Sequence, residues 1–488
     1  MRRYYFTAAA GVLFLGLLGY VLWSGGTAGT PVTARIILKV EPQKVESLTI
    51  RHDGQVAAVL RKVGERWEIE QPRRVRASQE AVQSLLDQVA SLEARRVIAE
   101  KAEDLSAYGL EPPRAELVMT EAGGTERRLL VGNETPVSSG APAYYAREGG
   151  GAAVYTIDAY LAEQLTGSWD QFRDRTLVAL SADEVQAVVV RKGRRSVEAR
   201  RAGDSTTPEG QRWRLVEPLQ APGDSDAIES VLRDLQFSRI SKFVSDDPSP
   251  GQLGAWGLKE PAATVELSGG DGTGNASRLT VVLIGGTAPD QERYVQVQGA
   301  PSVYTVPESD VKSLLEASVD GWIRRRVVGL SRDDLQRLSV RMSGRPGPLT
   351  LEKDSRGRWV LQPGGRSVDQ QEADSLLDAL VGLRGDRVEV ASRVAVSPGG
   401  NAPTGAGAPV TMEITVAGND RIPVTRLVMP VVSEGAGAGK GSQVEVHVEQ
   451  GEDRLTYFMP ASSLQEVERI IAQWTAPPST QGTASSGR

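Results

Sequence analysis

The sequence contains no cysteine and only two histidines, His52 and His447, among its 488 residues. The absence of cysteine excludes disulfide bonds, thiolate metal sites, a cysteine nucleophile and a lipid-modified N-terminal cysteine. Two histidines leave little imidazole for metal binding or general-base catalysis. Because most familiar catalytic and metal sites are difficult to assemble from this composition, we expect a protein that is not an enzyme and that holds no metal or cofactor.

The chain also lacks an excess of positive charge. Its 56 Lys and Arg residues face 62 Asp and Glu residues, which leaves a formal net charge of -6. We therefore expect no nucleic-acid partner, since binding to a phosphate backbone requires a basic surface. With 40% hydrophobic and 24% charged residues the chain is typical of a globular protein, and its length predicts about three domains of roughly 150 residues each.

Only one long apolar run is present. Arg2 and Arg3 precede residues 4–23, which carry no charged side chain, and the next charge is at Arg35. Twenty residues at about 1.5 Å each span roughly 30 Å, the thickness of the hydrocarbon core of a bilayer. We expect residues 1–34 to comprise a cytoplasmic stub, one transmembrane helix and a short linker. The two arginines place the N-terminus in the cytoplasm, which leaves the bulk of an inner-membrane protein in the periplasm.

A cleaved signal peptide is the alternative for this segment. The small residues Gly26, Ala28 and Ala34 follow the apolar run and could offer a peptidase site. The apolar run is longer than the 7–15 residues that are usual in such a signal. We therefore favour the uncleaved anchor, and under both interpretations the rest of the chain is exported.

An internal triplication organises the exported part. Trp67, Trp213 and Trp359 are spaced 146 residues apart, and each begins a strand-like segment that ends in proline. The segments read WEIEQP, WRLVEP and WVLQP. Alternating apolar residues upstream of each tryptophan predict β-hairpins. These hairpins are expected within residues 45–60, 185–199 and 335–351.

A helix is predicted after each of these segments. Ser78, Asp224 and Asp369 are candidate N-caps, and the residues that follow have apolar side chains at i, i+3, i+4 and i+7. Asp369 with Glu372 has the pattern of a capping box. The matching stripes are Val82, Leu85, Leu86 and Val89; Ile228, Val231, Leu232 and Leu235; and Leu376, Leu377 and Leu380.

The first two copies share a further helix-stop signal. In YGLEPP (108–113) and WGLKEP (256–261) a glycine that can adopt positive φ is followed by leucine and then by proline. The third copy lacks this signal, and glycine, proline and alanine predominate in its residues 397–409. A second glycine-rich segment, 433–442, is expected to be a flexible loop rather than a phosphate-binding loop, because its spacing does not fit that motif.

These patterns predict an α+β fold with three tandem repeats after one N-terminal transmembrane helix. Each repeat is expected to be an antiparallel sheet with helices packed on one face. The expected boundaries are 35–180 for the first repeat, 181–330 for the second and 331–475 for the degenerate third. Residues 476–488 are expected to form a disordered tail.

Candidate functional side chains are few. His52 is interpreted as a strand-end residue, and His447, flanked by Glu445 and Glu449, as part of the solvated face of a strand rather than a metal site. We favour a packing role over sugar stacking for the three repeated tryptophans. Arginines are clustered near the end of the first and second repeats, and they either cap helix C-termini, which we favour, or contact an acidic partner or sugar acid. The possible partner contacts are Arg173, Arg175, Arg324, Arg325 and Arg326.

The tryptophan segment, the leucine-rich helix, the G-L-x-x-P stop and the V-Y-x-[VI] strands at 154–157 and 303–306 together resemble the bacterial DUF4340 family, a domain of unknown function. The resemblance implies a membrane-anchored protein that accompanies ABC-type transport components of the gliding-motility type, and it carries no catalytic residues over to this chain. We therefore expect a non-enzymatic accessory or scaffold subunit that contacts an ABC permease or ATPase. The alternative is an envelope protein that binds polysaccharide or peptidoglycan.

Overall fold

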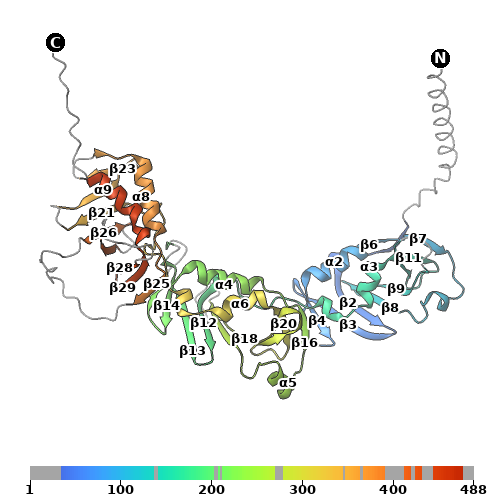
Figure 1. Cartoon of the computed structure of the whole chain (residues 1–488). Coiled ribbons are helices and arrows are strands. Elements are labelled where there is room, and N and C mark those ends of the chain that lie inside the picture. The colour runs from blue at the N-terminus through green and yellow to red at the C-terminus, as the bar shows by residue number, and fades with distance from the viewer. Residues whose placement is uncertain are drawn as a thin grey trace, which may run out of the picture. The chain divides into compact units, whose positions relative to one another are not determined.

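The computed structural model describes residues 35–136, 141–202, 207–208, 211–269, 278–343, 347–362, 366–390, 411–418, 424–430 and 443–475. The chain divides into two compact units, Met1–Arg175 and Thr176–Arg488 (Figure 1). Each unit is described by itself below.

The first unit contains a nine-stranded antiparallel sheet. In spatial order its strands are β5 (Val75–Arg76), β4 (Arg66–Gln71), β3 (Gln55–Val63), β2 (Val45–His52), β8 (Ala115–Glu121), β9 (Glu126–Glu134), β10 (Ala143–Glu148), β11 (Val154–Asp158) and β7 (Arg96–Ala99). Strand β1 (Ile36–Lys39) pairs separately with β6 (Ser91–Glu93). The helices are α2 (Gln79–Ala90) and α3 (Ala159–Thr166), with short 3₁₀ helices η1 (Pro42–Lys44), η2 (Ser106–Tyr108) and η3 (Trp169–Phe172).

The second unit contains two sheets with the same strand order as the first. The second sheet consists of β15 (Ala221–Pro222), β14 (Trp213–Glu217), β13 (Arg195–Arg201), β12 (Val185–Lys192), β17 (Ala263–Gly269), β18 (Arg278–Ala288), β19 (Glu292–Val297), β20 (Val303–Pro307) and β16 (Lys242–Ser245). Its helices are α4 (Ser225–Phe237), α5 (Pro250–Ala255), α6 (Glu308–Glu316) and α7 (Val319–Trp322), with η4 (Ala182–Glu184) and η6 (Pro289–Gln291).

The third sheet repeats this arrangement. It consists of β24 (Arg366–Ser367), β23 (Trp359–Gln362), β22 (Leu349–Lys353), β21 (Arg337–Met342), β26 (Thr411–Ala417), β27 (Thr425–Pro430), β28 (Gln443–Gln450), β29 (Asp453–Pro460) and β25 (Arg387–Val390). Its helices are α8 (Gln370–Gly382), η7 (Ala461–Leu464) and α9 (Gln465–Thr475). The expected antiparallel sheets and helices are therefore confirmed.

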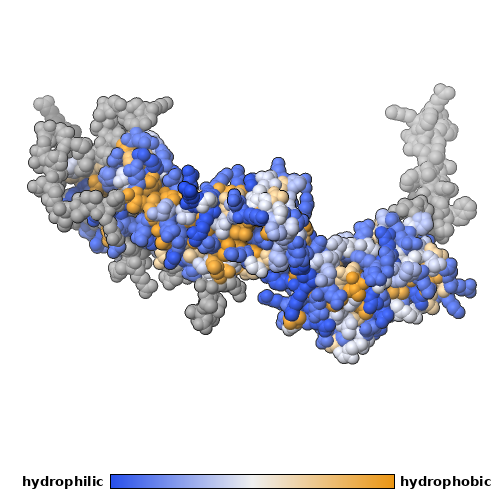
Figure 2. All heavy atoms as spheres, turned by 90° about the horizontal axis from the view of Figure 1, so that it is seen from below, coloured by the Kyte–Doolittle hydropathy of each residue, from blue (hydrophilic) through white to orange (hydrophobic). Residues whose placement is uncertain are grey.

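Alternation along the strands explains why each sheet needs a helical cover. In β2, β12 and β17 every second or third side chain is buried while the others reach solvent, so the apolar residues line one face. The predicted stripes of α2, α4 and α8 are buried and provide the opposite side of the core. On the face shown in Figure 2, hydrophilic side chains cover most of the surface, with smaller apolar patches between them.

The predicted helix starts are confirmed. The side chain of Ser78 accepts a hydrogen bond from the N–H of Ala81, and Asp224 accepts one from Ala227. Asp369 accepts one from Gln371. The expected capping box is wrong, because the carboxylate of Glu372 instead accepts a hydrogen bond from the indole N–H of Trp474 at 3.0 Å. A tertiary contact has replaced the local one.

Several expectations fall outside the described residues. They are the anchor in residues 1–34, the glycine-rich segments at 397–409 and 433–442, and the tail at 476–488. Among the residues that the structure does describe, none of the helices combines the length and the apolar character needed to cross a bilayer.

The helix-stop signal forms the predicted Schellman motif twice. Gly109 and Gly257 have φ angles of 65° and 69°. The N–H of the following leucine donates to the carbonyl five residues earlier in each case, from Leu110 to Leu105 at 3.0 Å and from Leu258 to Leu253 at 2.8 Å. The expected stop is confirmed in both copies.

A second glycine makes each stop possible. A Cβ atom on Gly132 of β9 would lie 2.2 Å from the carbonyl oxygen of Tyr108, and one on Gly285 of β18 would lie 2.4 Å from that of Trp256. The turn therefore lies directly against the strand backbone, which only glycine permits. In the third sheet Pro430 occupies the corresponding register position, and the sequence there also lacks the stop.

We predict that Gly285→Ala destabilises the protein by about 1–3 kcal/mol, because its methyl group would overlap main-chain atoms that cannot move independently. Gly254→Ala is the matched control, since a Cβ there would meet only the side chain of Lys259 at 3.7 Å. Urea unfolding followed by tryptophan fluorescence measures both. Equal midpoints for the two variants would contradict the close approach.

Candidate functional site

Two of the five candidate arginines are enclosed by the protein. Arg173 is 3% exposed; its guanidinium donates to the Asp170 carboxylate at 3.0 Å and lies 4.8 Å from the ring centre of Trp169. Arg324 is 2% exposed, and its Nη2 donates to Oε1 of Gln450 at 2.9 Å. Both guanidinium groups thus lie in the interior of the described structure, and contact with a partner stays the alternative prediction for these two side chains.

The other three candidates reach solvent. Arg175 is exposed, while Arg325 and Arg326 are partly exposed. Arg325 donates to main-chain carbonyls of Asp386 and Asp320, and Arg326 donates to the carboxylate of Asp226 at 3.0 Å. The arginine runs are thus not one basic patch, and their side chains divide between the interior and the surface.

Arg324 belongs to a junction between the second and third sheets. Across it Arg214 forms a two-bond ion pair with Asp453, at 2.6 and 2.7 Å. The hydroxyl of Tyr457, whose pKa is raised by burial, donates to the carbonyl of Arg326 at 3.3 Å. One continuous apolar core extends through both sheets. These contacts make the junction part of the folded interior of the second unit.

His52 lies next to a helix C-terminus. Nε2 of His52, at the end of β2, lies 2.7 Å from the carbonyl oxygen of Leu165 near the end of α3. Lys192 is at the same position in the second sheet and donates to the carbonyls of Leu315 and Ala317, at 2.8 and 2.5 Å. Basic side chains at a helix C-terminus satisfy carbonyls that have no partner within the helix. Burial, followed by the nearby charge of Arg195, lowers the pKa of Lys192.

His447 lies on the solvated face of β28, as the sequence predicts. It is exposed, with Nδ1 3.0 Å from the hydroxyl of Thr456 and Nε2 4.0 Å from the carboxylate of Glu445. Glu449, the third member of the candidate set, instead pairs with Arg426 at 3.1 Å. Within the described stretches, no three His, Asp or Glu side chains are grouped so that they could hold a metal ion.

The three repeated tryptophans are buried, with 6%, 0% and 3% of Trp67, Trp213 and Trp359 exposed. In two copies the side chain of a glutamine at the start of the helix forms hydrogen bonds with the main chain of the tryptophan. Gln79 accepts from the Trp67 N–H at 2.8 Å and donates to its carbonyl at 3.1 Å, and Gln370 does the same for Trp359 at 2.9 Å each. The rings therefore form part of the core.

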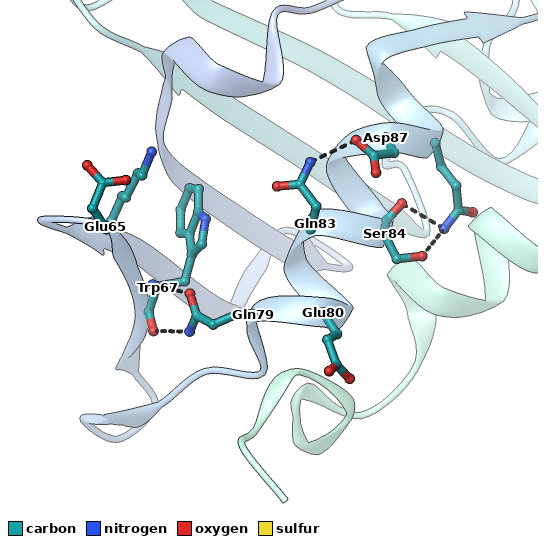
Figure 3. A pocket seen from close by; sticks show the side chains of 9 residues that line it. Glu65, Trp67, Gln79, Glu80, Gln83, Ser84 and Asp87 are labelled. Carbon is teal, nitrogen blue, oxygen red and sulfur yellow. Dashed lines mark hydrogen bonds between the residues drawn. The ribbon is translucent and has the colours of Figure 1, made fainter.

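An open hollow of about 900 Å³ adjoins Trp67, between the β3–β4 hairpin and helix α2 (Figure 3). Apart from Trp67, the residues that line it have polar or charged side chains. The lining residues are Lys62, Glu65, Trp67, Gln79, Glu80, Gln83, Ser84, Asp87 and Gln88. No local sequence pattern predicts this hollow; the one signal in the sequence is that Gln83 replaces the Glu229 of the second copy.

A family model described as "Domain of unknown function (DUF4340)" matches two segments, residues 67–212 and 213–399. The chain belongs to the DUF4340 family. Both matches in this DUF4340 protein begin at one of the repeated tryptophans, Trp67 and Trp213. Comparisons with curated proteins and with solved structures give no match.

We predict that Arg324→Ala lowers the free energy of unfolding of this DUF4340 protein by about 1–3 kcal/mol, because it removes a charged donor from a buried hydrogen bond and leaves a void. Arg325→Ala, at the neighbouring and partly exposed position, should change it by no more than about 0.5 kcal/mol. Chemical denaturation compares the two. A larger loss for Arg325→Ala would contradict the assignment of Arg324 to the interior.

Proposed function

We propose that this DUF4340 protein is a non-enzymatic, single-pass inner-membrane protein whose periplasmic body is an accessory or scaffold subunit of an ABC-type transport or gliding-motility complex. The recurrence of the same strand order in three sheets supports this proposal most directly. We interpret the sheets as three tandem copies of one unit. Repeated units multiply the surface that a chain offers to partners.

The membrane location rests on the N-terminal sequence. Residues 4–23 are uncharged and long enough to cross a bilayer, and Arg2 and Arg3 favour a cytoplasmic N-terminus. The anchor would bring the body close to a permease in the same membrane. The expected association with ABC components comes from the family resemblance, and it identifies the permease or the ATPase as the first partner to test.

Glycan binding is the second candidate function. The observation that favours it is the hollow beside Trp67, where an indole ring and amide side chains lie together. Indole rings and side-chain amides are suitable for contacts with sugar rings and hydroxyl groups. An envelope polysaccharide or peptidoglycan strand would be the ligand.

We predict that the full chain, tagged at its C-terminus and extracted from membranes in mild detergent, co-purifies with a permease and an ATP-binding subunit in fixed ratio. Quantitative mass spectrometry of the purified complex measures that ratio. A chain that carries the same tag but lacks residues 1–34, exported by a cleavable signal, is the control, and its recovery of the permease should fall at least tenfold. Retention of a glycan without any transport subunit would favour the second candidate instead.

A further inference from the structure

The indole N–H of Trp67 has no hydrogen-bond acceptor among the residues that the structure describes, although only 6% of the residue is exposed. The nitrogen is not among the fully buried side-chain atoms without a partner, so it is open to the hollow rather than enclosed by the core. In Figure 3 the nitrogen edge of the ring faces the side of the hollow that helix α2 forms. This donor, which has no acceptor in the described ranges, is therefore directed into the hollow.

In the second sheet, side chains of the chain itself provide both a hydrogen-bond acceptor and a cation for the corresponding tryptophan, Trp213. The indole N–H of Trp213 donates to Glu229 at 3.2 Å, and the guanidinium of Arg201 lies 4.8 Å from the ring centre. Arg201 is also 3.9 Å from Glu229. Acceptor, cation and ring thus form one cluster, in which the cation is held by both the carboxylate and the π face.

The third sheet keeps the cation. The ammonium group of Lys353 lies 5.1 Å from the ring centre of Trp359. In all three sheets the residue directly opposite the tryptophan on the neighbouring strand is basic, namely Lys62, Arg201 or Lys353. A cation over the ring is therefore the usual arrangement in this chain.

The first sheet departs from that arrangement at two points. Gln83 is at the helix position that Glu229 has in α4, and its amide donates to Asp87 at 2.8 Å rather than accepting from Trp67. In the part of the chain that the structure describes, no cation is stacked on the Trp67 ring, and Lys62 lines the hollow instead. Counting only the residues that the structure describes, neither an acceptor nor a stacked cation accompanies the Trp67 ring.

The charge of the hollow favours a positive ligand. Its wall carries three carboxylates, Glu65, Glu80 and Asp87, against the one ammonium of Lys62, which gives a net charge of 1 - 3 = -2. An anionic ligand would be repelled. A neutral glycan could accept the indole hydrogen bond, but it would leave these carboxylates without a counter-charge.

We propose that this hollow binds an arginine or lysine side chain on an extended segment of a partner protein. The cation takes the place over the Trp67 ring that Arg201 and Lys353 occupy in the other sheets, and a main-chain carbonyl of the segment accepts the indole hydrogen bond. The proposal rests on the proposed function in one respect, that the partner is a subunit of the same complex.

The test uses the full chain in detergent, labelled with 5-fluorotryptophan and observed by ¹⁹F NMR. Trp67→Phe identifies the Trp67 resonance. The probe is the peptide acetyl-Gly-Arg-Gly-amide, and its control replaces arginine by citrulline, which has nearly the same shape without the charge. We expect the arginine peptide to shift the Trp67 resonance selectively, with an affinity at least about threefold higher than that of the citrulline peptide.

A charge-matched pair of double variants completes the test. Glu80→Gln with Asp87→Asn should weaken binding of the arginine peptide by about two- to fivefold for each carboxylate removed. Glu46→Gln with Glu103→Gln removes two exposed carboxylates that do not line the hollow, and it should leave the affinity unchanged. Circular dichroism spectra of both double variants verify that they are folded.

Three results would overturn the proposal: no shift of the Trp67 resonance, an equal response to the citrulline peptide, or a shift produced by a neutral chito-oligosaccharide in place of the arginine peptide. The last result would assign the hollow to glycan. Because the peptide titration needs no other subunit, its failure is distinguishable from failure of the proposed complex, which is measured by co-purification.

Discussion

Burial of one face of each antiparallel sheet under a helix is the constraint on which the rest of the structure depends. A sheet of this kind is apolar on one side only, so it is stable only when that side is covered. The covering helix begins at a capping side chain, Ser78, Asp224 or Asp369, and its buried stripe completes the core. In the first and third sheets, Gln79 and Gln370 also connect the start of the helix to the strand that contains the tryptophan.

Once this framework is in place, positions around it can vary without loss of the fold. The glycine pair that allows the helix stop to contact the sheet is present in two sheets, whereas the third has Pro430 at the register position of the strand glycine. The basic residue that caps a helix C-terminus is His52 in the first sheet and Lys192 in the second. The third has Met342 at that position. Such differences between copies are where separate functions can arise, and the surroundings of Trp67 are one example.

The sequence was sufficient for the features that depend on local spacing. Hairpins, helix starts and the Schellman stops follow from alternation, from the 3.6-residue period and from glycine followed by leucine. It was insufficient where a distant residue decides the outcome. The buried guanidinium of Arg324 donates a hydrogen bond to Gln450, which is 126 residues further along the chain. Glu372 accepts a hydrogen bond from Trp474 instead of capping the helix N-terminus. No local pattern contains that information.

The hollow illustrates both cases. Its residues come from a predicted hairpin and a predicted helix, and the replacement of Glu229 by Gln83 between copies is visible in the sequence. The position of the Lys62 ammonium relative to the Trp67 ring depends on the conformation of the lysine side chain. The alternation of apolar residues along the sequence does not determine that conformation. The charge balance of the wall also becomes apparent only when the lining residues from β3, β4 and α2 are brought together.

Photo-crosslinking in intact cells tests most directly whether this protein acts by contacting another subunit. A photoreactive phenylalanine at position 83, in the wall of the hollow, should form a covalent adduct with a protein subunit of the complex that we propose. The same group at position 46, which does not line the hollow, should form little or none. Adducts with glycan alone, or none from any exposed position of the body, would contradict the account.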